Sequence, residues 1–168
     1  MNLSESKFIA ADRDTVWQAL LSADMLKECV PGCTEMAGSP AEGFEATVVQ
    51  KVGPVKATFK GAVSLSDIVE GQSLMLSGEG KGGAAGFAKG SANVTLSDQD
   101  GGTLLSYEVE AKVGGKLAQL GSRIIDGFAK KMADQFFENF RSAVEGPSDE
   151  ETKEDTAEKK GWFKKIIG

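Results

Sequence analysis

Residues 114–144 read GGKLAQLGSRIIDGFAKKMADQFFENFRSAV, and this stretch decides the fold. After the glycine pair, large apolar side chains recur every three or four residues, at Leu117, Leu120, Ile124, Phe128, Met132, Phe136 and Phe140. This spacing places them on one face of an α-helix, because one helical turn takes 3.6 residues. We therefore predict one long amphipathic helix from Lys116 to Val144, whose apolar face must pack against another layer.

The chain before this helix has the period of a β-sheet. In residues 54–66, apolar or small residues alternate strictly with mostly polar ones. A period of two with one polar face is typical of an antiparallel sheet that is solvated on one side. The same reasoning predicts strands over 3–11, 43–52, 72–82, 87–97 and 103–113, with turns at Glu70-Gly71 and at 100–102.

Two short helices are predicted between the first strand and the rest of the sheet. Asp14 is the expected N-cap of the first, and Asp24 of the second, which should stop at Pro31-Gly32. The order of strand, two short helices, antiparallel strands and long helix predicts an α+β fold. A curved antiparallel sheet should wrap around the C-terminal helix, because this arrangement buries both apolar faces.

Small residues cluster at one end of two predicted strands. Gly78, Gly80 and Gly82 share one face, and Ala88, Gly90 and Ala92 share another. Glycine in a strand costs stability and fills no space. The pattern favours a cavity between sheet and helix, while close approach of the helix backbone and bulges that bend the sheet stay open as alternatives.

Three segments closely resemble the family of the carbon monoxide dehydrogenase G subunit, which belongs to the START and Bet v 1-like helix-grip superfamily. They are DTVWQALLSADMLKECVPGC at 14–33, GPVKATFKG at 53–61 and GGKLAQLGSRIIDGFAKKMADQFFENF at 114–140. The resemblance covers nearly all of residues 1–145 in the right order. It implies a helix-grip domain with an elongated apolar cavity and without catalytic machinery.

The resemblance also implies a role. Members of the family are encoded near molybdenum hydroxylases of the carbon monoxide dehydrogenase type and are implicated in placing that enzyme at the cytoplasmic membrane. The function expected is a non-catalytic accessory protein that carries a quinone, menaquinone or ubiquinone, between membrane and enzyme, as an accessory to electron transfer. The alternative is an adaptor that recruits or matures the enzyme and transports no ligand. The residues expected to line the cavity are Leu21, Met25, Leu26, Phe59, Phe87, Leu117, Leu120, Gly121, Ile124 and Phe128.

The residues themselves argue against several chemistries. The chain has no histidine, so neither a Ser-His-Asp nor a Cys-His arrangement can form, and no metal-ligand cluster is visible. The net charge of −6 argues against nucleic-acid binding. Residues 78–83 fit G-x-G-x-x-G, but a strand pattern follows where a helix N-terminus would have to hold the phosphates. An enzyme on this fold is the least favoured interpretation.

Cys29 and Cys33 flank a Pro-Gly turn in CVPGC. Two thiols without histidine do not complete a zinc site. Structural thiols beside a tight turn are the favoured interpretation, with a disulfide or a redox role as alternatives.

The last residues differ in composition from the rest. Residues 146–160 are rich in acids and lack large apolar side chains, so we predict a disordered linker. In residues 161–168, GWFKKIIG, Trp162, Phe163, Ile166 and Ile167 share one helical face, while Lys164 and Lys165 point elsewhere. This pattern predicts reversible attachment to an anionic membrane, and the alternatives are a partner's groove or docking back onto the domain.

The expected location follows from the same residues. The start of the chain has no basic segment followed by an apolar one, and no window reaches 18 apolar residues. We expect a cytoplasmic protein that is peripheral on the inner face of the cell membrane, in contact with its inner leaflet.

Overall fold

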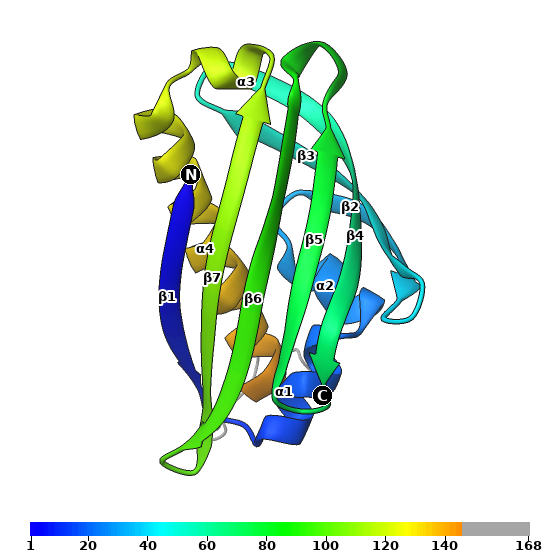
Figure 1. Cartoon of the computed structure of the whole chain (residues 1–168), viewed down its shortest axis with the longest axis vertical. Coiled ribbons are helices and arrows are strands. Elements are labelled where there is room, and N and C mark those ends of the chain that lie inside the picture. Colours follow the sequence, from blue (N-terminus) through cyan, green and yellow to red (C-terminus); the bar gives the residue numbers. More distant parts are fainter. Residues whose placement is uncertain (146–168) are drawn as a thin grey trace, which may run out of the picture.

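The computed structural model describes residues 1–145; the predicted linker (146–160) and amphipathic segment (161–168) lie outside the described residues. The described elements follow in chain order, as labelled in Figure 1: β1 (Asn2–Ile9), α1 (Arg13–Leu20), α2 (Ala23–Cys29), β2 (Cys33–Ser39), β3 (Gly43–Val52), β4 (Val55–Val69), β5 (Ser73–Lys81), the 3-10 turn η1 (Gly83–Ala85), β6 (Phe87–Gln99), β7 (Gly102–Gly114), α3 (Lys116–Gln119) and α4 (Ser122–Glu145).

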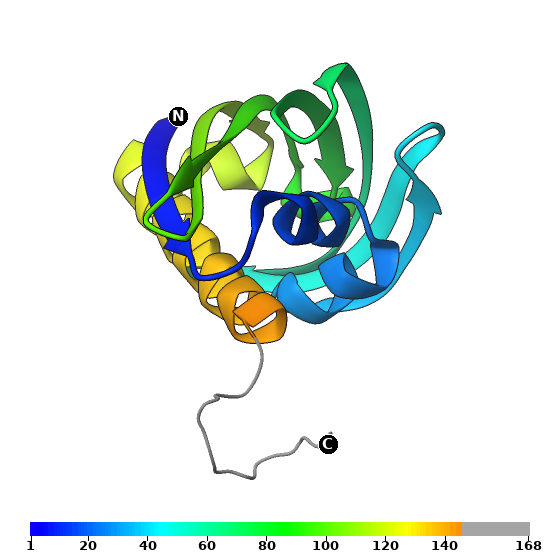
Figure 2. The ribbon, with the colours of Figure 1, turned by 90° about the horizontal axis from the view of Figure 1, so that it is seen from below.

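The strands form one antiparallel sheet of seven strands in the order β1-β7-β6-β5-β4-β3-β2. Seen from one end, the sheet curls strongly, and α4 runs along the opening between its two edges (Figure 2). The predicted curved sheet around a long C-terminal helix, with two short helices after the first strand, is confirmed. Among the described residues, no helix is both long enough and apolar enough to cross a bilayer.

The predicted N-caps of the two short helices are wrong. Asp12 caps α1 by accepting a hydrogen bond from the backbone N–H of Thr15, and Ser22 caps α2 by accepting one from Met25. In each case the cap lies two residues before the predicted aspartate. Both aspartates sit in the first turn instead, where a negative charge still interacts favourably with the helix dipole.

Strand β2 was not predicted, because its sequence CTEMAGS has only one large apolar side chain, Met36, and no regular alternation. It forms by pairing with β3 as the edge strand of a hairpin. Gly38 and Gly43 at this hairpin have positive φ angles of 125° and 89°, which glycine adopts without strain.

The predicted single helix from Lys116 to Val144 is also wrong in its first part. The chain forms a short α3, then Gly121 adopts φ 90°, and α4 starts at Ser122. A residue in this left-handed region cannot continue a right-handed helix. The period of three to four survives across the break, which is why the sequence pattern did not reveal it.

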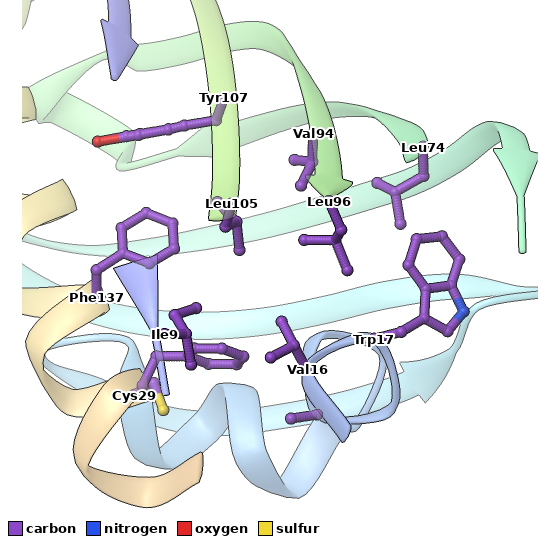
Figure 3. Packing of buried hydrophobic residues seen from close by; sticks show 12 residues of the cluster. Ile9, Val16, Trp17, Cys29, Leu74, Val94, Leu96, Leu105, Tyr107 and Phe137 are labelled. Atoms are coloured by element: carbon purple, nitrogen blue, oxygen red, sulfur yellow. The ribbon is translucent and has the colours of Figure 1, made fainter. Parts of the chain in front are cut away.

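The best-packed part of the core lies at the end of the molecule where α1, α2 and the C-terminal half of α4 meet the sheet. Phe140 is completely buried there. So are Trp17, Ile9, Val16 and Leu105, which Figure 3 shows. Phe136, Phe137 and Phe140 of α4 form an aromatic cluster with Tyr107 of β7, with ring centroids 4.9 to 6.4 Å apart. Such aromatic packing fixes the C-terminal half of α4.

Candidate functional site

A cavity of about 560 Å³ lies between the inner face of the sheet and the helices. Its volume falls in the range of small-molecule binding pockets. The lining side chains are almost all aliphatic or aromatic. They are Leu20, Leu21 and Leu26 with Val30 and Met36; Phe44, Ala46 and Val48; Phe59, Val63 and Leu65; Leu74 and Leu76; Ala88, Ala92 and Val94; Leu105, Val109 and Ala111; and Phe136 and Phe137, together with Gly61, Gly78, Gly80 and Gly90.

Figure 3 shows the wall of this cavity where it borders the core. Leu74, Val94 and Leu105 come from three different strands, and Phe137 approaches from α4. All four are buried, with between 0% and 9% of their surface exposed. The packed core therefore forms the floor at one end of the cavity.

The other end of the cavity is lined by small residues that adjacent strands bring into register. Gly61 on β4 pairs with Gly80 on β5, and Gly80 pairs with Ala88 on β6. A Cβ atom added at Gly80 would meet no atom within 4 Å, so the space in front of it is open. The missing side chain at Gly80 thus accounts directly for cavity volume. Gly90 differs, because a Cβ atom there would lie 2.4 Å from the carbonyl oxygen of Glu110, so close approach of the β7 backbone requires glycine at that position.

Gly82 belongs to the predicted glycine set but has a different environment. A Cβ atom there would lie 2.4 Å from the ring of Phe59, so that ring fills the space. Gly82 is not among the lining residues, whereas Phe59 is. Of the six small residues singled out in the sequence, Gly78, Gly80, Ala88, Gly90 and Ala92 line the cavity.

The small residues at this end of the cavity also make the sheet thin, because they add little or no side chain to its backbone. A second hollow, of about 1010 Å³, lies against the sheet and shares Gly78, Gly90 and Ala111 with the cavity. Glu79, Lys89 and Ser91 border both hollows, although alternation points their side chains to the outer face. At this patch the wall of the cavity is little more than one layer of backbone.

Three of the ten residues expected to line the cavity do so: Leu21, Leu26 and Phe59. The other seven are not among the lining residues, and the expectation for them is corrected. They are Met25, Phe87, Leu117, Leu120, Gly121, Ile124 and Phe128.

The break before α4 explains most of these corrections. Leu120 and Ile124 pack over the β3–β4 turn, where the Ile124 methyl carbon Cγ2 lies 3.5 Å from a Cβ built at Gly53. Leu117 is buried but in α3, Gly121 is exposed at the break, and Phe128 is half-buried on α4. The helix face that reaches the cavity is its C-terminal part, through Phe136 and Phe137.

Met25 and Phe87 are absent from the cavity lining for other reasons. Met25 packs against the core cluster from α2. Phe87 lies on the outer face of the sheet, is 42% exposed, and covers Gly114, whose added Cβ would lie 2.3 Å from its ring. The alternation on β6 already places Phe87 opposite in face to Ala88, and this signal was available in the sequence.

Sequence reasoning missed most of the lining. Val63, Leu65, Leu74 and Leu76 were on the inner face of predicted strands, so the period-two pattern could have identified them. Met36 could not be identified, because β2 has no alternation.

Beside the cavity, charged groups join α4 to the edge strand β1. Lys130 on α4 lies 2.8 Å from Glu5 and 2.9 Å from Asp134, and Lys7 lies 3.1 Å from Asp134. The Tyr107 hydroxyl donates to the Glu5 carboxylate at 3.2 Å. Glu5 and Lys7 occupy the inner face of β1, so here the helix meets the sheet through ion pairs instead of apolar packing.

The network shifts the ionisation of its members. The hydrogen bond from Lys130 lowers the pKa of Glu5, against a smaller opposing effect of burial, and also lowers the pKa of Asp134. The bonds to Glu5 and Asp134 raise the pKa of Lys130. Burial, with the nearby Glu5 charge, raises the pKa of Tyr107 to about 12. All these groups therefore keep their ordinary charge at neutral pH.

The CVPGC turn has a structural role in the described fold. Both cysteines are free thiols; burial raises the pKa of Cys29 to about 11, with a further contribution from Glu28. Gly32 adopts φ 79° and its carbonyl accepts a 2.9 Å hydrogen bond from the Val49 N–H, while Gln50 donates to the Pro31 carbonyl. Within residues 1–145 no group of acids and cysteines is placed to hold a metal ion.

Known proteins share this architecture. The family model for the G subunit of carbon monoxide dehydrogenase (CoxG) matches residues 6–145. No curated protein matches the chain. A solved structure of a conserved protein from Geobacillus kaustophilus is 26% identical with a TM-score of 0.80, over 86% of this chain and 95% of that one.

More distant structures show the fold alone. A protein of Chromobacterium violaceum is 16% identical with a TM-score of 0.64, over 86% of this chain and 97% of that one. The crystal structure of Ara h 8.0201 is 14% identical with a TM-score of 0.58, over 86% of this chain and 94% of that one. The helix-grip arrangement is thus shared at low identity.

Proposed function

The chain belongs to the CoxG family, and we propose that it is a non-catalytic accessory protein that carries a quinone between the cytoplasmic membrane and an enzyme of the carbon monoxide dehydrogenase type. The observation that supports carriage is the apolar cavity of about 560 Å³. A quinone with its isoprenoid chain is an apolar molecule that must leave the bilayer to reach a soluble enzyme. A cavity of this composition offers it a comparable environment.

The cavity suits an apolar ligand because little in it could bind a charge. The polar residues among the lining, Glu79, Lys89 and Ser91, direct their side chains to the outer face. Binding must then rest on burial of apolar surface, with roughly 25 cal/mol gained for each Å² removed from water. Such binding selects for shape and hydrophobicity, as a carrier of membrane-soluble molecules requires.

The proposal assigns separate roles to the remaining parts of the chain. Trp162, Phe163, Lys164, Lys165, Ile166 and Ile167 would attach the protein reversibly to the inner leaflet, through a linker that lets the domain turn toward its partner. The partner is a molybdenum hydroxylase of the carbon monoxide dehydrogenase type. The domain formed by residues 1–145 would enclose the ligand and carry out no bond-making step.

The test is native mass spectrometry of the full chain after incubation with menaquinone or ubiquinone in detergent. The wild type should retain close to one quinone per chain. Gly80→Val should lose most of this binding, because its side chain enters open cavity space. Ser77→Val, on the outer face of the same strand, should bind as the wild type does.

Two results would contradict carriage. A wild type that stays empty when quinone is offered removes the ligand from the proposal and leaves the recruitment adaptor. Equal loss in Gly80→Val and Ser77→Val would show that the cavity is not where the quinone binds.

A further inference from the structure

One end of the molecule concentrates positive charge. It comprises the β3–β4 turn, the turn from β5 through η1 to β6, and the segment from the end of β7 into α4, which Figure 1 shows at the same end. Residues 46–66, 80–97 and 111–125, which form this end and the strands leading to it, contain no aspartate or glutamate. The eight cations in these segments, here called the basic end, are Lys51, Lys56, Lys60, Lys81, Lys89, Lys112, Lys116 and Arg123.

The strand register places six of these lysines directly opposite one another in pairs. Lys51 is directly opposite Lys56, Lys60 is opposite Lys81, and Lys89 is opposite Lys112. Like charges directly opposite on neighbouring strands are destabilising. Three such pairs at one end of one sheet break a local rule of sheet stability, and violations of this kind are expected at functional sites.

Among the described residues, only one cation of the basic end, Lys89, lies directly opposite an acid. All eight are exposed, and none takes part in an ion pair within residues 1–145. The acid closest in register is Glu79, opposite Lys89. The positive charge is therefore available to an external anion.

Apolar groups stand among these cations. Phe87 is 42% exposed and pairs in register with Lys81 on one side and Gly114 on the other. Ile124, also 42% exposed, is the residue after Arg123. Lysines around exposed apolar side chains are the combination that binds an anionic bilayer, because the lysines reach the headgroups while the apolar groups enter the interface.

We propose that the basic end is a docking surface of the folded domain for an anionic membrane leaflet. This extends the membrane association of the proposed function, on which it rests, and it requires nothing of residues 161–168. Docking in this way brings the small-residue end of the cavity toward the bilayer, because Gly61, Gly80 and Ala88 lie in register beside Lys60, Lys81 and Phe87. An acidic partner protein would be the competing occupant, but exposed Phe87 and Ile124 favour lipid.

The test measures binding of the full chain to vesicles of phosphatidylcholine with about 30% phosphatidylglycerol, at about 0.1 M NaCl, where charge still acts over roughly 10 Å. The variant K60Q/K81Q/K89Q/K112Q removes two of the lysine pairs. We expect it to bind at least about tenfold more weakly than the wild type, since each lysine near an anionic surface contributes strongly. The variant removes two repulsive lysine pairs and one favourable pairing, that of Lys89 with Glu79, so it should fold about as stably as the wild type.

The matched control is R13Q/K27Q/K131Q/R141Q, which makes the same change in net charge elsewhere. It should bind within about threefold of the wild type, because its four cations lie outside the basic end. Vesicles of phosphatidylcholine alone should bind the wild type poorly. Equal effects of the two quadruple variants, or equal binding to both kinds of vesicle, would overturn the proposal.

A second comparison separates this surface from the C-terminal segment. If W162S/F163S in the full chain abolishes binding while the lysine variant binds normally, attachment belongs to the C-terminal segment alone and the basic end is not a docking surface. If the lysine variant binds vesicles normally but no longer associates with the hydroxylase, the occupant is an acidic protein and the lipid proposal fails. If the lysine variant loses vesicle binding while native mass spectrometry finds no quinone, the docking surface stands and carriage fails.

Discussion

At the scale of single residues, the structure gives glycines two opposite roles. Gly32 is required because a Cβ atom there would lie 2.1 Å from the carbonyl oxygen of Val49, in a backbone that already has φ 79°. Gly80 is different, since a Cβ atom there meets nothing within 4 Å. The first glycine holds two segments together, and the second leaves space unfilled.

Gly32→Ala should therefore destabilise the protein strongly. The clash with β3 backbone cannot be relieved by a side-chain movement, and the left-handed conformation adds about 1–2 kcal/mol for a non-glycine residue. We expect a loss of about 3 kcal/mol or more in the free energy of unfolding, which is in the range of severe single substitutions. Urea unfolding followed by circular dichroism measures it. A loss under about 1 kcal/mol would show that the turn is not held as described.

At the scale of elements, α4 has two differently fixed halves. Its C-terminal half is anchored by Phe137 and Phe140, whereas its N-terminal half meets β1 through Glu5, Lys7 and Lys130. Gly127 lies in the less buried half, and a Cβ atom there would meet nothing within 4 Å. Apolar packing therefore constrains this half of the helix least.

Gly127→Ala should stabilise the protein by roughly 1 kcal/mol, because alanine is the better helix former and the added methyl group has room. Gly121→Ala is its control, since the same methyl group is placed in open space but at φ 90°. That variant should lose about 1–2 kcal/mol. Thermal unfolding of both variants measures the difference, and changes of the same sign would contradict the assigned helix break.

The ion-pair network predicts a pH dependence. The folded-state pKa of Glu5 lies below its ordinary value of 4.5, so its contribution is present above about pH 4.5 and is lost as the pH falls below that. In Glu5→Gln, stability should therefore fall less steeply on acidification than in the wild type. Urea unfolding between about pH 7 and about pH 3 provides the comparison. Parallel profiles for the two proteins would mean that Glu5 is not ionised in a stabilising pair.

The sequence predicted elements better than it predicted the site. Strong alternation located β3 to β7 within a few residues, and the apolar period located the C-terminal helix. The sequence pattern does not predict strand β2, because this strand forms through pairing with β3 and not through its own composition. The helical period predicts Leu120 and Ile124 at the cavity, because a period alone does not show that the helix is interrupted at Gly121.

At the scale of the whole molecule, stability and the cavity oppose each other. Small inner residues of β4 to β6, such as Gly61, Gly80 and Ala88, leave volume that larger side chains could fill. Glycine within a strand also costs conformational entropy. A protein selected only for stability would not keep these residues, so the open volume is consistent with the proposed ligand binding.

The substitution Gly80→Val should show whether stability and open cavity volume oppose each other. A β-branched residue suits a strand, and its side chain enters open space, so the unliganded variant should be more stable by about 1 kcal/mol. Added quinone should raise the melting temperature of the wild type, because a ligand that binds only the folded state stabilises it, and should leave that of Gly80→Val nearly unchanged. A variant that is less stable yet responds fully to quinone would contradict this account of the cavity.

The segregation of charge also has a consequence for approach to a surface. The chain carries a net charge of −6. Figure 1 shows α1 and the β6–β7 turn at the end away from the basic end, and Asp12, Asp98 and Asp100 lie together at these elements, so the molecule is an electric dipole as well as an anion. The 24 residues of α4 alone span about 36 Å, several times the screening length of roughly 8 Å at physiological ionic strength. Under those conditions a negative membrane attracts the basic end and scarcely repels the opposite end.

At about 0.01 M salt, where screening extends to roughly 30 Å, repulsion of the whole anion competes with this attraction. Vesicle binding should therefore pass through a maximum at intermediate ionic strength, and the dipole orients each molecule before contact.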